Sequence, residues 1–481
     1  VQLGLTLEQL AAAVDRAPSQ LSAIENGKRE PRLPLLRALA GALGVTVDEL
    51  LGTGAGLPQT TRFMFESVTE YDIDFVKHYD IHAGWAKEIR IVGTDREKLL
   101  VRLASNQISS LAADFKVKIA AEVKGFNPEE RIDKRAAKRM DRFTQFAVAA
   151  AKEAFKNAGL ENADFDRSRF GVLISSGIGG LATIESEHKK ALERGFDRVS
   201  PFFVPMNIAN LAAGHVAIEL GAKGSCSCVV TACAGGTNAI GEAFRHIRDG
   251  YAEIVVAGGA EASITPLGIA GFSSMKALCE SNDPARSSIP FDAERSGFVM
   301  GEGAGILILE EYNHAVARGA NIIAEIVGYG ATCDSYHITA PCPDGAGAAA
   351  AMEQAIKDAG ISPGNIQYIN AHGTSTPLND AIETAAVKKA FGGHANNLAI
   401  SSTKSMTGHM LGASGAVEAV ITVMAVAEGF LPPTINYKCP DPECDLDIVP
   451  NRGRECEIQY AMSNSLGFGG HNASVIFRKF S

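Results

Sequence analysis

The chain has 481 residues, a hydrophobic fraction of 46%, a charged fraction of 21% and a formal net charge of −10. This length and apolar content predict roughly two or three globular domains with a sizeable core. The negative charge argues against broad, sequence-independent nucleic-acid binding, although it is compatible with a local basic patch.

No membrane-spanning helix is expected, because the sequence has no uninterrupted apolar run of about 20 residues. The first residues, VQLGLTLEQL, lack the charged start and apolar core of a secretory signal. The chain carries nine cysteines, an odd number. We therefore expect free thiols and a location in a reducing cytoplasm.

Residues 1–51 consist of short segments with Leu and Ala at helical spacing, separated by breaks at residues 15–18 and 26–27. The pattern predicts a small all-α domain. Residues 52–61 are expected to be a linker. The segment that follows, up to residue 113, indicates only a strand at Glu88–Val92 and a helix at Arg96–Ala104.

Residues 114–481 alternate apolar, strand-like runs with amphipathic helical stretches. This alternation favours an α/β layered fold with buried sheets. The predicted strands are Phe170–Ile174, Cys228–Thr231, Ile254–Ala257, Gly305–Leu309, Leu398–Ser401 and Ala473–Phe477.

The first candidate site is Cys233. Residues 227–238 run from an apolar strand into a glycine-marked turn, and a helix follows through Ala239–Ile247. A thiol at a helix start is favoured as the thiolate, which is the nucleophilic form, by the helix-end amides and the macrodipole. The same local pattern also fits a buried cysteine that packs as a small, inert apolar residue.

No metal site is predicted from the other cysteines. Cys226 and Cys228 form a C-x-C pair that strand alternation would bury on one face. Cys439, Cys444 and Cys456 lie near one another in sequence, but no second, properly spaced pair completes a set of four ligands.

Two histidines lie in glycine-rich segments at strand ends, where α/β folds tend to place functional groups. His372 follows a strand that ends near Ile369, and His409 follows Lys404 by five residues. Together with a nucleophilic cysteine, the two histidines can support acyl transfer. Lys404 is either a member of this site or a solvated surface charge.

Residues 464–472 read NSLGFGGHN and predict a tight turn before the last strand. Backbone amides in such a turn can help to form an oxyanion hole. The alternative is a simple loop.

These segments closely resemble the condensing enzymes of the thiolase superfamily, specifically the elongating β-ketoacyl-acyl-carrier-protein (ACP) synthases of type II. The resemblance runs from about Asp114 to the C-terminus and implies a duplicated αβαβα layered fold. The matching blocks are VTACA at 230–234, FDAERSGF at 291–298, GEGAG at 301–305, AHGTST at 371–376, GH at 408–409 and GFGG at 467–470. Initiating synthases use a His and an Asn, and chain-length-factor relatives lack the cysteine, so this pattern resembles an active elongating enzyme.

The resemblance implies a role for each matching residue. Cys233 would attack the thioester of acyl-ACP, and the backbone amides of Cys233 and Phe468 would stabilise the oxyanion. His372 and His409 would promote decarboxylation of malonyl-ACP and stabilise the enolate. Lys404 would support the histidines electrostatically.

The substrate-binding residues follow from the same resemblance. Thr374 and Thr376 would hold the phosphopantetheine arm of the carrier protein. Ile178, Phe272 and Phe468 would line or gate the acyl pocket. The resemblance implies a homodimer without a cofactor of its own, because ACP carries the thioester.

A cluster of basic residues at 131–142 agrees with an acidic carrier-protein partner, which such a patch can steer. A solvated helix face is the alternative interpretation. The basic residues are Arg131, Lys134, Arg135, Lys138, Arg139 and Arg142.

The N-terminal part departs from the synthase pattern. The family's opening strand and glycine turn have no counterpart before Asp114, and we expect Glu88–Val92, followed by Gly93, to replace that strand. Residues 1–51 instead resemble helix-turn-helix domains of the lambda-repressor/Xre kind. That resemblance would place Ser19, Gln20 and Ser22 in the DNA major groove.

The charge of residues 1–51, with five basic and six acidic side chains, is weak for phosphate binding. Three functions are therefore considered. The first is an elongating synthase, the second a DNA-binding regulator whose synthase-like domain senses acyl groups, and the third an artificial fusion with an impaired synthase.

Overall fold

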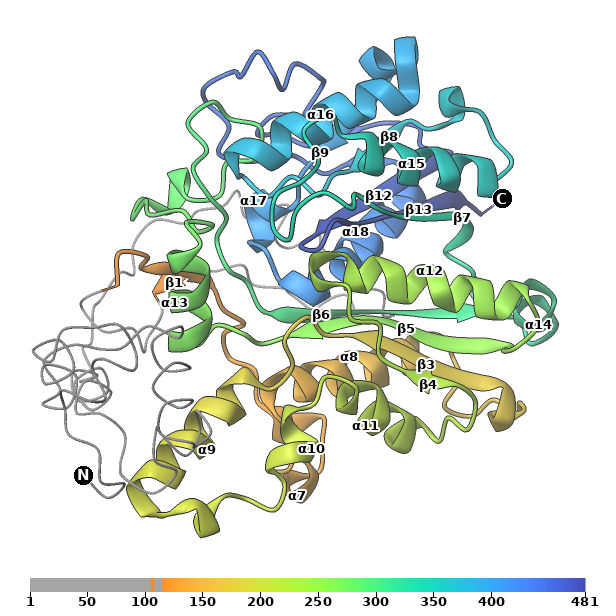
Figure 1. The fold of residues 1–481 in the computed structure, drawn as a ribbon. Coiled ribbons are helices and arrows are strands. Elements are labelled where there is room, and N and C mark those ends of the chain that lie inside the picture. The colour runs from red at the N-terminus through yellow and green to blue at the C-terminus, as the bar shows by residue number, and fades with distance from the viewer. Residues whose placement is uncertain (1–104, 108–114, 481) are drawn as a thin grey trace, which may run out of the picture. The chain divides into compact units, whose positions relative to one another are not determined.

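A computed structural model describes residues 105–107 and 115–480 of the chain (Figure 1). The predicted helix-turn-helix segment, with Ser19, Gln20 and Ser22, lies outside the described residues. So do the predicted strand Glu88–Val92 and the predicted helix Arg96–Ala104.

The described residues form two main sheets with the same internal order. The first is four-stranded, in the order β4-β3-β5-β6, and its last pair is antiparallel. The second is five-stranded, in the order β7-β13-β12-β8-β9, and the pairs β12–β13 and β13–β7 are antiparallel. The first sheet comprises β3 (Phe170–Ser175), β4 (Cys226–Ser227), β5 (Ile254–Glu261) and β6 (Gly303–Glu310). The second comprises β7 (Ala324–Cys333), β8 (Tyr368–Asn370), β9 (Ala399–Ser401), β12 (Tyr460–Gly467) and β13 (His471–Lys479).

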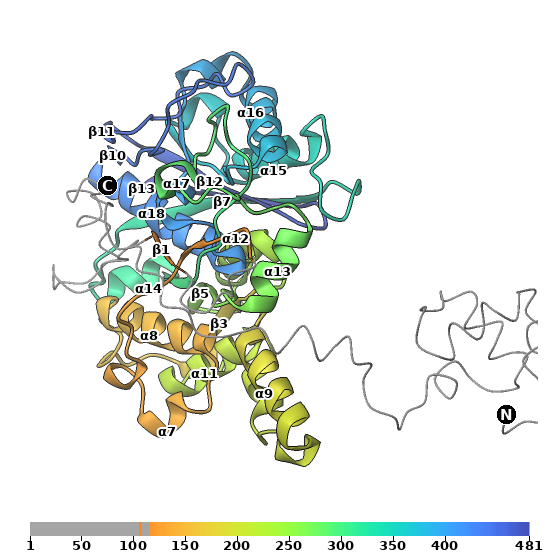
Figure 2. The ribbon, with the colours of Figure 1, turned by 90° about the vertical axis from the view of Figure 1, so that its left-hand side faces the viewer.

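Helices cover both faces of both sheets, which gives the layer order α-β-α-β-α (Figures 1 and 2). The outer layer on the first sheet holds α8 (Arg142–Asn157) and α11 (Leu211–Leu220). The central layer holds α12 (Gly235–Arg248) and α18 (Ser414–Glu428). The outer layer on the second sheet holds α15 (Ala346–Asp358) and α16 (Pro377–Phe391).

Shorter elements complete the described part. Two antiparallel pairs stand apart from the main sheets: β1 (Ser105–Gln107) with β2 (Ile119–Ala121), and β10 (Phe430–Leu431) with β11 (Arg454–Glu455). The remaining α-helices are α7 (Lys134–Ala137), α9 (Leu181–Arg194), α10 (Phe203–Asn207), α13 (Pro266–Ser274), α14 (Tyr312–Ala317) and α17 (Lys404–Thr407).

The central layer is tightly packed because small residues line the contact between its helices. A Cβ on Gly236 of α12 would lie 2.6 Å from the backbone nitrogen of Ala416 in α18. Residues 411–428, which include α18, are long and apolar enough to cross a membrane, but 83% of that window is buried inside the protein. The segment is therefore a core helix, whose apolar surface is covered by the two sheets.

The layered α/β fold predicted for residues 114–481 is confirmed, and most predicted strands lie within one residue of their observed starts or inside longer strands. The predicted strand Cys228–Thr231 is wrong: β4 ends at Ser227, and the chain then turns towards Ala232, whose φ is +49°. The turn predicted at residues 464–472 is shorter than expected, since β12 extends to Gly467. The strand β7 has no counterpart in the prediction.

Candidate active site

Cys233 lies in the single turn Ala232–Ala234, directly before α12 begins at Gly235. The preceding residue, Ala232, adopts a left-handed φ of +49°, which is strained for a residue with a side chain. The turn thus presents the Cys233 thiol at the start of a central helix, where it is 7% exposed.

Burial dominates the protonation of this thiol. Desolvation raises the pKa of Cys233 to about 12, while the Lys404 charge and the backbone N–H of Phe468 act in the lowering direction. The thiolate expected from the helix start is therefore not the resting form, because the loss of hydration outweighs the nearby positive groups. Attack by Cys233 must be coupled to removal of its proton.

His372 follows β8, and a buried carboxylate fixes its backbone. The N–H groups of His372 and Gly373 both donate to Glu383 of α16, at 2.8 Å each. Burial raises the pKa of Glu383 to about 7, and the two N–H donors act against that rise. Glu383 therefore holds the histidine turn without contacting its imidazole.

Lys404 lies on the other side of this imidazole. Its Nζ is 3.4 Å from His372 Nδ1 and forms an ion pair with Glu418 of α18, and both side chains are 1% exposed. An ammonium group has only donors, so the facing Nδ1 must be the acceptor. This arrangement leaves the proton of neutral His372 on Nε2.

The Nδ1 atom of His409 faces a hydroxyl group instead of a cation. Its Nδ1 lies 2.9 Å from Ser414 Oγ, and that oxygen already accepts the backbone N–H of Met410 at 2.8 Å. The Ser414 hydroxyl can donate its proton to His409 Nδ1, an arrangement in which the ring proton lies on Nε2. Burial and the Lys404 charge lower the pKa values of His372 and His409, so both rings are neutral. Their centroids are 5.3 Å apart.

The turn between β12 and β13 approaches Cys233 closely. A Cβ on Gly467 would lie 2.8 Å from the carbonyl oxygen of Thr231 and 3.2 Å from the backbone nitrogen of Cys233. The backbone N–H of the next residue, Phe468, is close enough to the Cys233 sulfur to act in the direction that lowers the thiol pKa. Two backbone donors, from Cys233 and Phe468, thus lie beside the thiol, as an oxyanion hole requires.

An aromatic row borders the same space. The Phe272 ring lies 6.4 Å from Phe468 and 5.5 Å from Phe298, and Phe298 is 5.0 Å from His409. Cys233 belongs to the apolar cluster that Phe272 and Phe298 help to form. The thiol therefore faces an apolar environment suited to a hydrocarbon chain.

Ile178 lies in a loop that the buried carboxylate of Glu261 organises. Glu261 accepts the N–H groups of Gly177 at 2.7 Å, Ile178 at 3.3 Å and Gly412 at 3.1 Å. The Ile178 side chain itself is 36% exposed. The loop is consequently fixed against the residues that follow His409.

Thr374 and Thr376 follow His372 on the same turn, and their hydroxyl oxygens are 2.9 Å apart. Thr374 is buried and Thr376 is half-buried. Either hydroxyl can donate to the other, which leaves one proton free for a polar ligand.

The basic residues at 131–142 divide into two groups. Arg142 donates to both carboxylate oxygens of Glu302, and Arg131 and Lys134 form ion pairs with Glu153 and Glu129. The exposed basic residues outside these ion pairs are Arg135, Lys138 and Arg139, of which Arg139 lies over the Phe202 ring.

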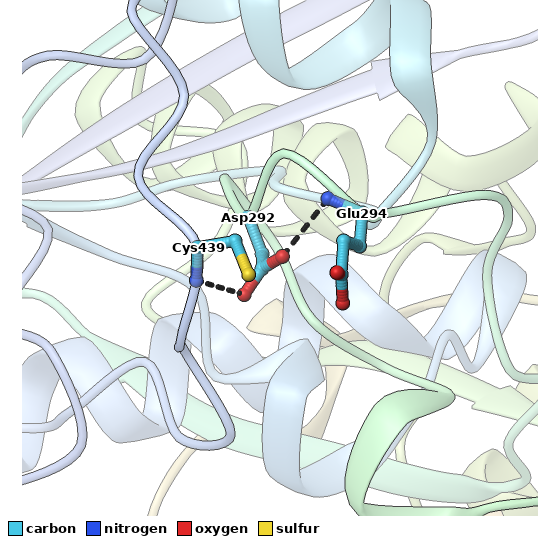
Figure 3. Close-up of side chains that lie close together, drawn as sticks. All are labelled: Asp292, Glu294 and Cys439. Carbon is cyan, nitrogen blue, oxygen red and sulfur yellow. Dashed lines mark hydrogen bonds between the residues drawn. The ribbon is translucent and has the colours of Figure 1, made fainter.

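Among the described residues, one group has metal-ligand spacing: Asp292, Glu294 and Cys439 (Figure 3). The Asp292 carboxylate already accepts the backbone N–H groups of Glu294 and Cys439, and Arg286 forms ion pairs with both carboxylates. These donors hold the pKa of Asp292 at about 2, so the cluster is a satisfied structural network. The predicted burial of Cys226 is wrong: that side chain is exposed and Cys228 is half-buried, because β4 is an edge strand.

Comparison with protein families identifies two matching domains of one enzyme family. Residues 96–315 match the N-terminal domain of beta-ketoacyl synthase, and residues 323–438 match its C-terminal domain. The chain belongs to the β-ketoacyl synthase family. The synthase match begins at residue 96, upstream of the resemblance read from the motifs. Residues 1–50 match a helix-turn-helix family, in agreement with the predicted all-α domain.

Curated relatives of this synthase include two named 3-oxoacyl-[acyl-carrier-protein] synthase 2. The one from Synechocystis sp. is 56% identical over 370 residues, which are 77% of this chain and 89% of the relative. The one from Staphylococcus aureus (strain N315) is 56% identical over 366 residues, 76% of this chain and 88% of the relative.

Solved structures agree with this assignment. The ishigamide ketosynthase/chain length factor is 36% identical with a TM-score of 0.74, and the match covers 79% of this chain and 94% of that one. A β-ketoacyl synthase from Burkholderia phymatum STM815 is 36% identical with a TM-score of 0.71, covering 76% and 89%. A type II polyketide ketosynthase in complex with its acyl-carrier protein, AntDE:AntF, is 38% identical with a TM-score of 0.71, covering 76% and 89%.

The synthase fold brings Cys233, His372, Lys404, His409 and Phe468 together from segments far apart in the sequence. Further residues, which were not predicted from the sequence, hold the site residues in place through hydrogen bonds or an ion pair. These are Glu261, Glu383, Ser414 and Glu418. Glu418 carried a visible signal, since it is the one charged side chain inside the apolar stretch 411–427.

Proposed function

We propose that this synthase elongates acyl chains by decarboxylative condensation of malonyl-ACP with an acyl group held on Cys233. The observation that carries the proposal is the buried group of one thiol, two neutral histidines and two backbone donors beside an apolar cluster. The identity of 56% to 3-oxoacyl-ACP synthases supports it. The enzyme is accordingly an acyltransferase with a role in fatty-acid synthesis.

In the first step, the Cys233 sulfur attacks the carbonyl carbon of acyl-ACP. The backbone N–H groups of Cys233 and Phe468 bind the oxyanion of the tetrahedral intermediate. The phosphopantetheine thiol leaves with the proton that Cys233 gives up, so atoms and charge balance. The raised pKa of Cys233 makes this proton transfer part of the attack.

In the second step, malonyl-ACP loses CO2, and its thioester oxygen becomes an enolate. With their ring protons on Nε2, the tautomer that lets Nδ1 accept from Lys404 and from Ser414, His372 and His409 each donate to that oxygen. The carbanion attacks the acyl-Cys233 carbonyl, the C–S bond breaks, and β-ketoacyl-ACP leaves two carbons longer. The thiol is regenerated with a proton from solvent.

The carrier protein supplies phosphopantetheine, so the reaction requires no cofactor bound by the synthase itself. Thr374 and Thr376, whose hydroxyl oxygens are 2.9 Å apart, would hydrogen-bond the arm beside His372. The exposed basic residues Arg135, Lys138 and Arg139 suit an acidic carrier surface. The ACP complex of the related AntDE:AntF ketosynthase supports this choice of partner.

A homodimer through β4 is part of the proposal. Within the part of the chain that the structure describes, β4 lies at the edge of the first sheet, and Val230, three residues after it, is 54% exposed. An apolar, unpaired edge is a template for pairing with a second copy. We also infer a cytoplasmic location and the domain division into 1–51, 52–113 and 114–481.

The direct test supplies purified protein with acyl-ACP and malonyl-ACP and follows β-ketoacyl-ACP by mass spectrometry. We expect a product two carbons longer from the wild type and none from Cys233→Ala. Cys456→Ala, which removes a half-buried thiol outside both the active site and β4, serves as the matched control and should retain activity. Condensation by Cys233→Ala would overturn the mechanism.

A second candidate function rests on the helix-turn-helix match at residues 1–50. DNA binding would be tested with the full chain on a library of duplexes at rising salt. Sequence-specific binding that Gln20→Ala abolishes would establish a regulatory function, with Ser19 and Ser22 as further contacts. Absence of specific binding would remove this candidate.

A further inference from the structure

Hydrogen bonds between three side chains connect the Cys233 turn to the second sheet. Asn238, the fourth residue of α12, donates from its side-chain amide to Thr231 Oγ1 at 2.7 Å. Tyr329 of β7 donates its hydroxyl group to Asn238 Oδ1, also at 2.7 Å. Because Thr231 stands two residues before Cys233, a strand of the second sheet is linked through side chains to the turn that carries the thiol.

The Tyr329 side chain is fixed by its packing. Its ring lies against Gly241 of α12, where a Cβ would be 2.3 Å from two ring carbons. The guanidinium group of Arg245 lies 4.4 Å from the ring centroid and forms an ion pair with Glu242. The side chain is 2% exposed, and burial together with the Glu242 charge raises the pKa of Tyr329. The hydroxyl group therefore keeps the proton that it donates.

The Cys233 turn needs support because its backbone is strained. Ala232 has a φ of +49°, and such a conformation persists only where the surrounding contacts impose it. One of these contacts is made by the backbone, since the N–H of Ala234 donates to the carbonyl oxygen of Thr231 at 3.1 Å. Asn238 adds a second contact through the Thr231 side chain. The residue that precedes the strained position is thus held by both its carbonyl and its hydroxyl group.

The strand β7 also contacts the turn that carries the second oxyanion donor. The backbone N–H of Asp334, directly after β7, donates to the carbonyl oxygen of Gly470 at 2.8 Å. Gly470 lies two residues after Phe468. One strand therefore supports the Phe468 turn through its backbone and the Cys233 turn through Tyr329.

We propose that Tyr329 and Asn238 are positioning residues for the nucleophile: through Thr231 they hold the Cys233 turn in its strained form, aligned with the Phe468 turn. This inference rests on the proposed acylation of Cys233. Without the two hydrogen bonds, the turn should relax and the thiol should lose its alignment with the oxyanion donors. Since the thiol is only 7% exposed, relaxation should also make it more accessible to reagents in solution.

Two variants that each remove a single hydroxyl group test the proposal. Tyr329→Phe and Thr231→Val should both slow acylation by acyl-ACP about tenfold, because small misplacements of a reacting group are costly. Malonyl-ACP decarboxylation should keep the wild-type rate, because His372 and His409 have other hydrogen-bond partners. Acylation at the wild-type rate, or an equal slowing of decarboxylation, would overturn the proposal. Tyr251→Phe, at a side chain that is 74% exposed, is the matched control and should change neither rate.

The double variant shows whether the three side chains act as one unit. Asn238 lies between the other two, so Thr231→Val/Tyr329→Phe should slow acylation no more than the slower single variant does. If the two effects multiply, the residues act independently and the proposal is contradicted.

Alkylation by iodoacetamide tests the turn without acyl-ACP, so a failure of the proposed function can be told from a failure of this inference. The modified residues are mapped by peptide mass spectrometry. Cys233 should react faster in Tyr329→Phe and Thr231→Val than in the wild type, whereas Cys279, which is 4% exposed, should react at an unchanged rate. An unchanged rate at Cys233, or an equal acceleration at Cys279, would overturn the inference. If the wild type takes no acyl group from acyl-ACP, these alkylation rates still decide.

Discussion

Variants of the Lys404–Glu418 ion pair should affect stability and catalysis differently. Both side chains are 1% exposed, and the second oxygen of Glu418 has no hydrogen-bond partner in the described protein. Lys404→Met would leave a buried carboxylate without its cation, a change that costs about 3–5 kcal/mol. Burial already raises the pKa of Glu418 to about 7, so proton uptake should reduce that loss at acidic pH.

Replacing both partners, as in Lys404→Met/Glu418→Leu, should recover most of the lost stability, since no buried charge is left. It should not recover turnover. Lys404 lowers the pKa of His372 and faces its Nδ1, so removing the cation raises that pKa. Because the neutral ring is the active form, the acidic limb of the pH–rate profile should move to higher pH.

The assays are urea unfolding and malonyl-ACP decarboxylation, each measured across pH for wild type, single and double variants. A loss below about 1 kcal/mol in Lys404→Met would refute the argument from buried charge. Full decarboxylation activity in the double variant, with an unmoved acidic limb, would refute the proposed effect on His372.

Three further predictions follow from particular contacts. Burial raises the pKa of Glu383 to about 7, above its ordinary value of 4.5, so the contribution of this carboxyl group to stability is lost as the pH rises through about 7. In urea unfolding, Glu383→Gln should therefore lose less unfolding free energy than the wild type between acidic and alkaline pH. An identical loss in the two proteins would contradict this prediction. A Cβ on Gly305 would lie 2.5 Å from the backbone nitrogen of Val417, so Gly305→Ala should cost about 1–3 kcal/mol of unfolding free energy. The control is Gly271→Ala, whose added Cβ meets no atom within 4 Å and which should cost little. Similar urea midpoints for the two variants would argue against this packing. Replacing the exposed basic residues of the 131–142 segment with Glu should raise the KM for ACP most strongly at low salt. Lys357→Glu on the distant helix α15 is the control. An equal effect of the control would exclude a specific patch. The exposed basic residues are Arg135, Lys138 and Arg139.

The predictable part of the fold is the part whose burial is continuous. β3 and β5 are buried at every residue, so their apolar runs are legible in the sequence. The strand β7 was not predicted because Gly328 and Gly330 interrupt its apolar pattern. These glycines do not form turns: a Cβ on Gly328 would collide with the carbonyl oxygen of Ala355, so they permit the close approach of α15.

The candidate site divides in the same way. Cys233 and the two histidines stand in local motifs, so their sequence neighbours reveal them. The contacts that set their protonation do not, because they join segments distant in sequence. Glu383 reaches back eleven residues to His372, and Glu418 meets Lys404 from the next long helix. The local pattern also predicts the wrong direction for the pKa shift of Cys233. The helix start, which lowers a thiol pKa, can be recognised in the sequence, whereas the burial that raises it cannot.

The central claim is that Cys233 carries the acyl group. The most direct measurement incubates the purified protein with acyl-ACP alone, then maps the acyl adduct by peptide mass spectrometry. We predict a single adduct on the peptide that contains Cys233, and none in Cys233→Ala. An adduct on the exposed cysteines Cys226 or Cys333, or no adduct on the wild type, would contradict the account.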